Sequence, residues 1–177
     1  MPGFRRNLGG MNIGAFAERF IRHGTKCSSA FHVMLAYEDY PAGRRAMDSC
    51  QLLLSEFDNE SDFHISVWRF DALEGTTTFE DAICNAIQAD AIIVATYQRE
   101  LPIGVRQWID AWVPQKRGQK AALIAFLQSD YASSAWHYLD EAAARAGLDF
   151  FATALDQPQT RISPSSDPVH EAWGLNE

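Results

Sequence analysis

Two carboxylates stand side by side at Glu38 and Asp39, directly after the apolar run 31–37. A third acidic residue, Asp130, follows a second apolar run, 121–127. If both runs are strands of one parallel sheet, the three side chains converge at one edge, where carboxylates can bind a cation or transfer protons. The structural alternative is that Asp39 and Asp130 cap the helices that follow them, while Glu38 is solvated.

Two basic residues, Arg44 and Arg45, lie in the first turn of a helix predicted to begin at Pro41. Guanidinium groups at that place can hold an anion such as a phosphate. Their structural alternative is an exposed ion pair with Glu38 or Asp48. A small polar ligand is therefore one expected partner of this region.

The sequence gives little support for nucleophilic catalysis, for a disulfide framework or for a zinc site. None of the five histidines has a Ser or Cys at a spacing that suggests nucleophilic catalysis. The three cysteines, Cys27, Cys50 and Cys84, are odd in number and lack close Cys or His neighbours, which argues against a disulfide framework and a zinc site. Cys50 and Cys84 sit among apolar residues in helix-like stretches, which indicates small buried hydrophobic side chains. We predict no metal site.

Strands and helices are predicted to alternate along the chain. The strand-like runs are 31–37, 64–70, 91–97, 121–127 and 148–155. Helical periodicity follows Pro41, Thr78, Leu101 and Ser133. The Thr78 hydroxyl is expected to cap its helix, the third helix to end before Pro114, and the last to stop at Gly147.

This alternation predicts an α/β fold. Right-handed crossovers imply a doubly wound three-layer sandwich with a five-stranded parallel sheet in the flavodoxin-like order 2-1-3-4-5. We divide the chain into an N-terminal arm at 1–30, the main domain at 31–155 and an irregular tail at 156–177 that is rich in Pro, Ser and Asp.

The arm differs from the rest of the chain in charge. Residues 1–30 carry five basic residues and one acidic residue, so the arm is +4 and, since the whole chain is −8, the rest is −12. An acidic body repels nucleic acid. Within the arm, residues 13–23 have the pattern of an amphipathic helix. Such a helix could pack against the core, form a homodimer contact or bind to an anionic membrane. We favour packing against the core, because the apolar stripe is short and the charges of the helix are mixed.

The length of 177 residues suits one core. No apolar run approaches the ~18 residues of a membrane span, and the first residues lack the continuous apolar stretch of a secretory signal. We therefore expect a soluble cytoplasmic protein without a transmembrane segment.

Ligands of such sheets bind beyond the carboxyl ends of the strands, near the point where strand order reverses. The loops after strands one, three and four supply the candidate crevice. Its residues are Glu38, Asp39, Arg44, Arg45, Thr96, Tyr97, Gln98, Arg99, Gln128, Ser129 and Asp130.

The segment 89–112, ADAIIVATYQRELPIGVRQWIDAW, resembles NADPH-dependent FMN reductases and related flavodoxin-like quinone reductases. ADAIIVAT matches the family's strand, and Leu-Pro at 101–102 matches the start of its helix. In that helix Arg106, Gln107, Ile109 and Asp110 stand at the family's Lys, Asn, Leu and Asp positions. The resemblance implies a flavodoxin-like fold and, with it, an FMN-dependent NAD(P)H oxidoreductase.

The loops that contact flavin in this family are altered here. Four residues separate Thr96 from Leu101 where the family has a longer Pro-Glu-Tyr-Asn-Gly connection. The first loop has Glu38 and Asp39 in place of the family's phosphate-binding serines, and two carboxylates repel a phosphate dianion unless the arginines turn inward. The third loop lacks the family's glycine pair.

We therefore expect a flavodoxin-like domain without bound FMN, which acts by protein contact or by binding a small polar ligand at the three loops. The alternative is a divergent FMN-dependent NAD(P)H oxidoreductase. Adjacent acidic residues after strand one also resemble receiver domains of response regulators. Phosphotransfer is disfavoured, because strand three ends in Ala95-Thr96-Tyr97 without a carboxylate and strand five ends without a Lys.

Overall fold

Five parallel strands form a single sheet in the computed structural model, which describes residues 30–55, 62–75, 77–128 and 132–155. The order β2-β1-β3-β4-β5 confirms the flavodoxin-like arrangement predicted from the sequence. The strands are β1 (Phe31–Tyr37), β2 (Phe63–Arg69), β3 (Ala91–Thr96), β4 (Ala122–Leu127) and β5 (Asp149–Ala154).

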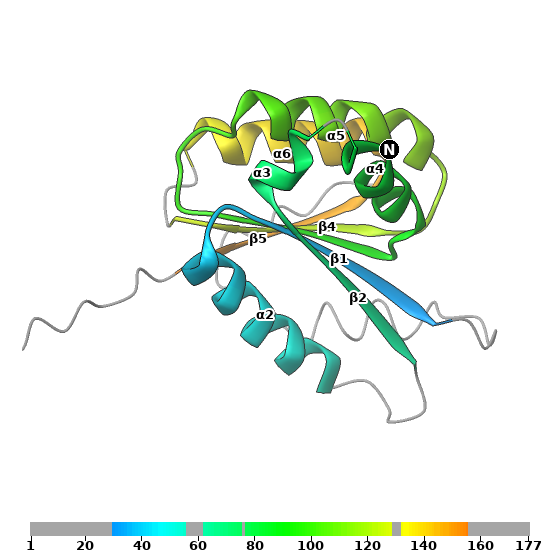
Figure 1. Ribbon diagram of the computed structural model, residues 1–177, viewed down its shortest axis with the longest axis horizontal. Coiled ribbons are helices and arrows are strands. Elements are labelled where there is room, and N and C mark those ends of the chain that lie inside the picture. Colours follow the sequence, from blue (N-terminus) through cyan, green and yellow to red (C-terminus); the bar gives the residue numbers. More distant parts are fainter. Residues whose placement is uncertain (1–29, 56–61, 76, 129–131, 156–177) are drawn as a thin grey trace, which may run out of the picture.

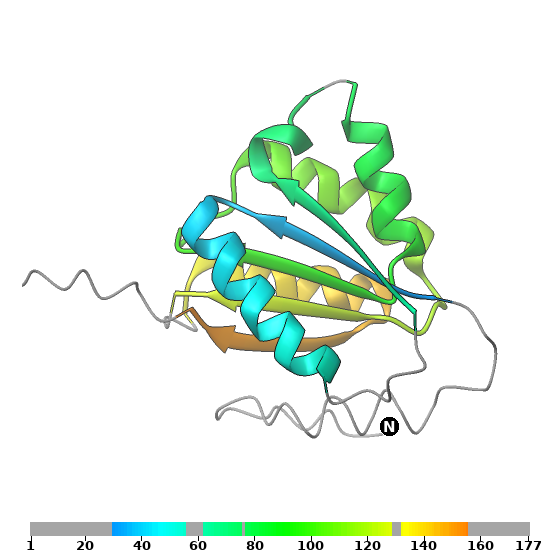
Figure 2. The same cartoon turned by 60° about the horizontal axis from the view of Figure 1, so that its bottom comes forward.

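Helices lie on both faces of this sheet. Of the described helices, α2 alone covers one face, and the other helices cover the opposite face (Figures 1 and 2). The helices are α2 (Tyr40–Ser55), α3 (Phe70–Leu73), α4 (Phe79–Gln88), α5 (Ile103–Lys116) and α6 (Ser134–Ala146).

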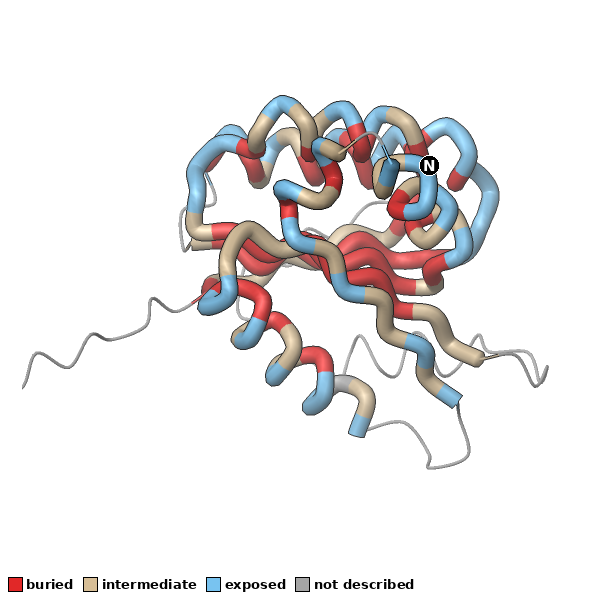
Figure 3. The backbone as a smooth tube through the Cα atoms, viewed as in Figure 1, coloured by how far each residue is buried: buried red, intermediate tan, exposed pale blue. Residues whose placement is uncertain are grey.

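The two central strands, β3 and β4, are buried along their whole length (Figure 3). Their sequences AIIVAT and ALIAFL are continuous apolar runs, as expected for strands covered on both faces. Successive side chains along these strands point to opposite faces and belong to two hydrophobic clusters, one on each side of the sheet. At the edge, β2 alternates between exposed and half-buried residues.

Two predicted helix boundaries have the expected local chemistry. The Asp39 carboxylate accepts a hydrogen bond of 2.9 Å from the N–H of Ala42, so Asp39 caps α2. Gly147 ends α6 with a left-handed φ of 72°, a conformation that glycine adopts without steric cost. Asp130 lies outside the described residues.

Two other boundary predictions are wrong. The Thr78 hydroxyl makes no cap bond to α4, because it donates instead to the carbonyl of Ala72. Pro114 lies inside α5, which continues to Lys116. The buried Lys116 ammonium donates to the carbonyls of Ile87 and Ala89, and these bonds hold the last turn of the helix in place.

Two further features differ from the sequence prediction. The short helix α3 was not predicted, and it begins at Phe70, which was expected to be the last residue of the second strand. Cys50 is buried, and its burial raises the pKa of its thiol to about 11, but Cys84 is exposed. The prediction for Cys84 is wrong because α4 turns Ala82 and Ala86 toward the core and Cys84 toward solvent.

Candidate functional site

The loops after β1 and β3 are joined by the side chain of Glu38. Its carboxylate accepts hydrogen bonds of 2.6 Å from the hydroxyl of Thr96, 2.9 Å from the N–H of Tyr97 and 2.7 Å from the side-chain amide of Gln98. The structural alternative had supposed that Glu38 is solvated, but its side chain is half-buried. The carboxylate therefore occupies three donors at the end of β3 and in the loop that follows it.

Burial of Glu38 acts to raise the pKa of its carboxyl. Hydrogen bonds from the Thr96 and Gln98 side chains and from the N–H groups of Tyr97 and Gln98 outweigh that effect, so the pKa is lowered from its ordinary value. Glu38 is thus a fixed anion at neutral pH. This places one negative charge where the loops after β1 and β3 meet.

Two backbone N–H groups add hydrogen bonds at the ends of β1 and β3. The N–H of Gln98 donates to the Thr96 hydroxyl at 3.0 Å, and the N–H of Glu38 donates to the carbonyl of Ala95 at 3.0 Å. Thr96 is fully buried, so its hydroxyl depends on these partners. The carboxyl ends of β1 and β3 are consequently tied together.

The N-terminus of α2 also has an internal anion. Helix N-termini attract anions because their first N–H groups lack partners within the helix. Here the Asp39 carboxylate accepts the N–H of Ala42. An external phosphate would have to displace this cap as well as approach Glu38.

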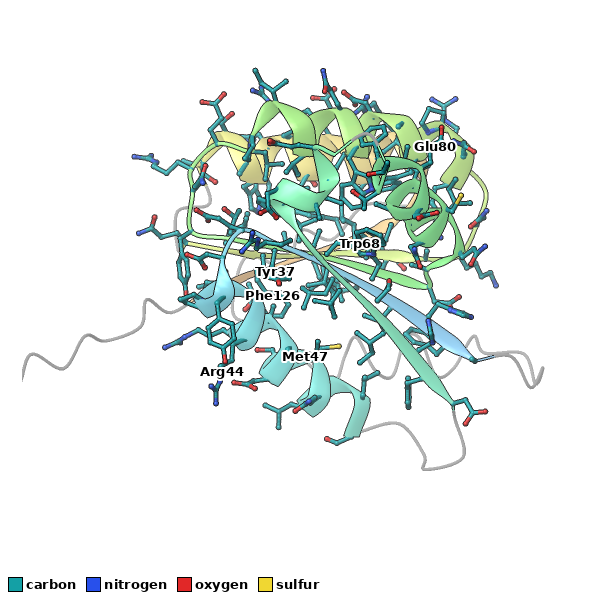
Figure 4. The ribbon with its side chains drawn as sticks, in the orientation of Figure 1. Tyr37, Arg44, Met47, Trp68, Glu80 and Phe126 are labelled. Atoms are coloured by element: carbon teal, nitrogen blue, oxygen red, sulfur yellow. The ribbon has the colours of Figure 1, made fainter. Side chains whose placement is uncertain are left out.

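Arg44 and Arg45 do not join this network but line a separate cleft on the α2 side. Arg44 donates to the Tyr40 hydroxyl at 3.4 Å, and Figure 4 shows Arg44 directed outward from the beginning of α2. The cleft has a volume of about 540 Å³, within the range of small-molecule sites. Its lining residues are Tyr40, Pro41, Arg44, Arg45, Asp48, Ser49, Phe126, Ala154 and Leu155.

The cleft combines cations with an aromatic and aliphatic wall. Two guanidinium groups come from α2, together with the exposed ring of Tyr40. Phe126 lies between α2 and the sheet in Figure 4, and Leu155 follows the end of β5. Asp48 offsets part of the positive charge. This arrangement suits an anionic group attached to an apolar one.

The other candidate residues have different positions. The carbonyl of Arg99 accepts the N–H of Ala135 at 2.9 Å, which links the loop after β3 to the start of α6. Gln128 is half-buried at the end of β4. Ser129 and Asp130 lie outside the described residues, so their convergence with Glu38 stays a prediction.

Residues that resemble the FMN reductase helix make structural contacts here. Ile109 is fully buried in the core. Asp110 forms an ion pair of 2.8 Å with Arg145 of α6, and Arg106 lies 3.4 Å from Glu100. These positions therefore account for the packing of α5 without reference to a cofactor.

The far wall of the cleft was not predicted from the sequence. Phe126 and Leu155 were assigned only to strands, because apolar residues in buried runs carry no local sign of a binding surface. Strand alternation was the available signal, since it places Phe126 on the same side of the sheet as α2. A smaller cavity of about 70 Å³ lies at the opposite edge and includes His32 and His64.

No group of three His, Cys, Asp or Glu side chains within the described residues is arranged to hold a metal ion. None of the helices in this part of the chain is long and apolar enough to cross a membrane. Comparison with protein-family models finds no match, and comparison with curated proteins finds none either.

Proposed function

We propose that this chain is a flavodoxin-like binding domain that works without FMN and recognises an anionic group at the cleft beside α2. The observation that carries the proposal is the pairing of Glu38 with Thr96, Tyr97 and Gln98. It satisfies the polar donors at the crevice from within the protein and leaves a negative charge there. An FMN phosphate would meet repulsion and few free donors.

The cleft beside α2, unlike the loops around Glu38, carries positively charged side chains. Arg44 and Arg45 provide two cations, and the exposed ring of Tyr40 provides flat apolar surface beside them, whereas Phe126 is only 3% exposed. Carboxylate or phosphate bound by arginine, with an apolar group against the ring of Tyr40, is the matching ligand chemistry. Such a group belongs either to a small polar ligand or to an acidic segment of a partner protein.

The first experiment tests the absence of FMN. FMN is titrated with the purified full-length protein while its fluorescence and the melting temperature of the protein are followed. We expect neither quenching nor a raised melting temperature. A yellow protein that quenches FMN at micromolar concentration would instead support the divergent oxidoreductase.

The second experiment tests the cleft. Benzoate, citrate and inorganic phosphate are screened by thermal shift against the wild type and against Arg44→Gln/Arg45→Gln. The control is Arg106→Gln, which removes an arginine from the opposite side of the sheet. We expect the aromatic carboxylate to stabilise the wild type and the control but not the double variant. An equal response in all three proteins would contradict recognition by these arginines.

A further inference from the structure

Two histidines lie side by side near the amino ends of β1 and of the edge strand β2. His32 and His64 are directly in register in the parallel pairing of these strands, so their side chains lie on the same face of the sheet. Their ring centroids are 5.4 Å apart, and the ring planes are tilted by 59°. Two neighbouring imidazoles are a donor set for a divalent transition-metal ion.

The separation of the two rings fits a shared ion. When two imidazoles bind one tetrahedral ion through nitrogens at about 2.0–2.1 Å, their ring centroids lie about 5 Å apart. The separation between His32 and His64 agrees with this geometry. Simple ring packing covers the same range of distances, so the surroundings of the pair have to distinguish the two cases.

The surroundings include a cavity of about 70 Å³ that adjoins both rings. Such a cavity holds a few water molecules, since one needs about 10–15 Å³. It is far smaller than the ~300 Å³ of the smallest typical ligand sites, so its size suits a hydrated ion and excludes an organic cofactor. The lining residues are His32, Val33, His64, Ser66, Asn85, Gln88 and Ala89.

Helix α4 brings oxygen atoms to the same cavity. Asn85 lies in its second half, and Gln88 is its last residue. The side-chain nitrogen of Asn85 donates to the carbonyl of Asp81 at 2.8 Å, which leaves the amide oxygen of Asn85 to act as a ligand. Two imidazole nitrogens, one amide oxygen and one water molecule together make a set of four ligands.

The backbone of His32 is held in place by Asp90. The N–H of His32 donates to the Asp90 carboxylate at 2.9 Å, and the N–H of Asp90 donates to the carbonyl of His32 at 2.8 Å. This pairing orders one ligand before any ion binds, which lowers the entropic cost of binding. The Asp90 carboxylate also adds a negative charge near the pair, although the Lys116 ammonium offsets part of it.

We propose that His32 and His64 bind a divalent transition-metal ion such as Zn²⁺, with the amide oxygen of Asn85 and water as the remaining ligands. No third His, Cys, Asp or Glu in the described part of the chain completes the set, so the ion should exchange with solvent and not be required for folding. The sequence predicted no metal site, because only strand pairing brings the two histidines together.

The bound ion would fasten the edge strand β2 to β1 and to α4. The cavity lies near the amino ends of the strands, whereas the cleft beside Arg44 and Leu155 lies at their carboxyl ends. The metal site is therefore independent of the anion-binding function proposed above.

The first experiment titrates Zn²⁺ into the full-length protein after treatment with a chelator. Calorimetry measures the affinity, and thermal unfolding measures the change in melting temperature. We expect Zn²⁺ to bind and to raise the melting temperature of the wild type. Mg²⁺ should do neither, because it prefers oxygen ligands in an octahedral arrangement. Failure of Zn²⁺ to bind the wild type would overturn the proposal.

Matched histidine variants locate the site. His64 is exposed, so His64→Gln should fold like the wild type, and urea unfolding without metal verifies this. Its affinity for Zn²⁺ should fall at least about tenfold. The control is His137→Gln, which removes another exposed histidine, on α6, and should bind Zn²⁺ like the wild type. Equal affinities in the wild type and His64→Gln would overturn the assignment of the ligands.

A gain of affinity tests the geometry of the cavity. Asn85→His adds a third imidazole where the amide oxygen is proposed to bind, and Cys84→His adds one at the exposed neighbouring position of α4. We expect Zn²⁺ to bind at least about tenfold more tightly to Asn85→His, with Cys84→His close to the wild type. An equal gain in both variants, or a gain in neither, would overturn the proposed arrangement.

Discussion

The carboxylate of Glu38, at the end of β1, accepts a hydrogen bond of 2.6 Å from the hydroxyl of Thr96, at the end of β3. They lie 58 positions apart along the chain. The contact joins the two loops at which ligands of this fold usually bind. The two loops are therefore held together by hydrogen bonds within the protein.

Replacing Glu38 by Gln should destabilise the protein by about 1–3 kcal/mol at pH 7, because a charged acceptor shared by three donors is lost. The folded state lowers the pKa of Glu38 below its ordinary 4.5, so the ionised form is the stabilising one. This stability is fully present above pH 4.5 and is lost as the pH falls through the lowered pKa. Urea unfolding of both proteins from pH 7 to pH 3 measures the difference, which should shrink in acid.

The matched control for this series is Glu80→Gln, which neutralises an exposed glutamate on α4 (Figure 4). It should follow the wild type within about 0.5 kcal/mol at every pH. A loss in Glu38→Gln that stayed constant down to pH 3 would show that the charge of Glu38 is not what stabilises the junction.

Thr96→Val should destabilise the protein by about 1–2 kcal/mol, because the buried hydroxyl both donates to Glu38 and accepts the N–H of Gln98. In the double variant with Glu38→Gln, the loss of unfolding free energy should be smaller than the sum of the two single losses by at least about 0.5 kcal/mol. The control is Thr77→Val at an exposed position. Additive losses measured by chemical denaturation would mean that Glu38 and Thr96 act independently.

Lys116 should make stability rise with pH in the alkaline range. Burial lowers the pKa of its ammonium from 10.5 to about 8, and the opposing attraction of Asp90 is smaller. Between these values the unfolded chain binds more protons than the folded one, so raising the pH favours folding. From pH 7.5 to pH 9.5 the wild type should gain about 2 kcal/mol relative to Lys116→Met. Parallel stability curves for the two proteins would contradict this assignment.

Two helical glycines should respond oppositely to alanine. A Cβ at Gly43 would lie 2.7 Å from the ring of Tyr37, which packs against the core, so Gly43→Ala should lose about 1–3 kcal/mol. A Cβ at Gly104 would meet the exposed, flexible side chain of Glu74, which can move away. Gly104→Ala should therefore be neutral or gain up to about 1 kcal/mol from helix propensity. Thermal unfolding separates the two cases, and equal losses would refute the distinction.

The order of the elements and the strand order of the sheet follow from local patterns along the chain. Continuous apolar runs at β3 and β4, alternation along the chain and the right-handed crossover leave few arrangements other than 2-1-3-4-5. The sequence also located Asp39 and Gly147 at helix ends, because their capping partners lie within a few residues of them. Such local signals are independent of the rest of the fold.

The grouping of the candidate site residues depends on contacts between segments that are distant in the sequence. Glu38 and Arg44 lie six positions apart in the sequence, but one turns toward Thr96 and the other toward Tyr40 and the cleft. Lys116 extends α5 past Pro114 because two carbonyls of another segment lie within its reach. In each case the deciding energy comes from a partner that is distant in sequence, and a side chain takes the direction in which its charge or hydrogen bonds are satisfied.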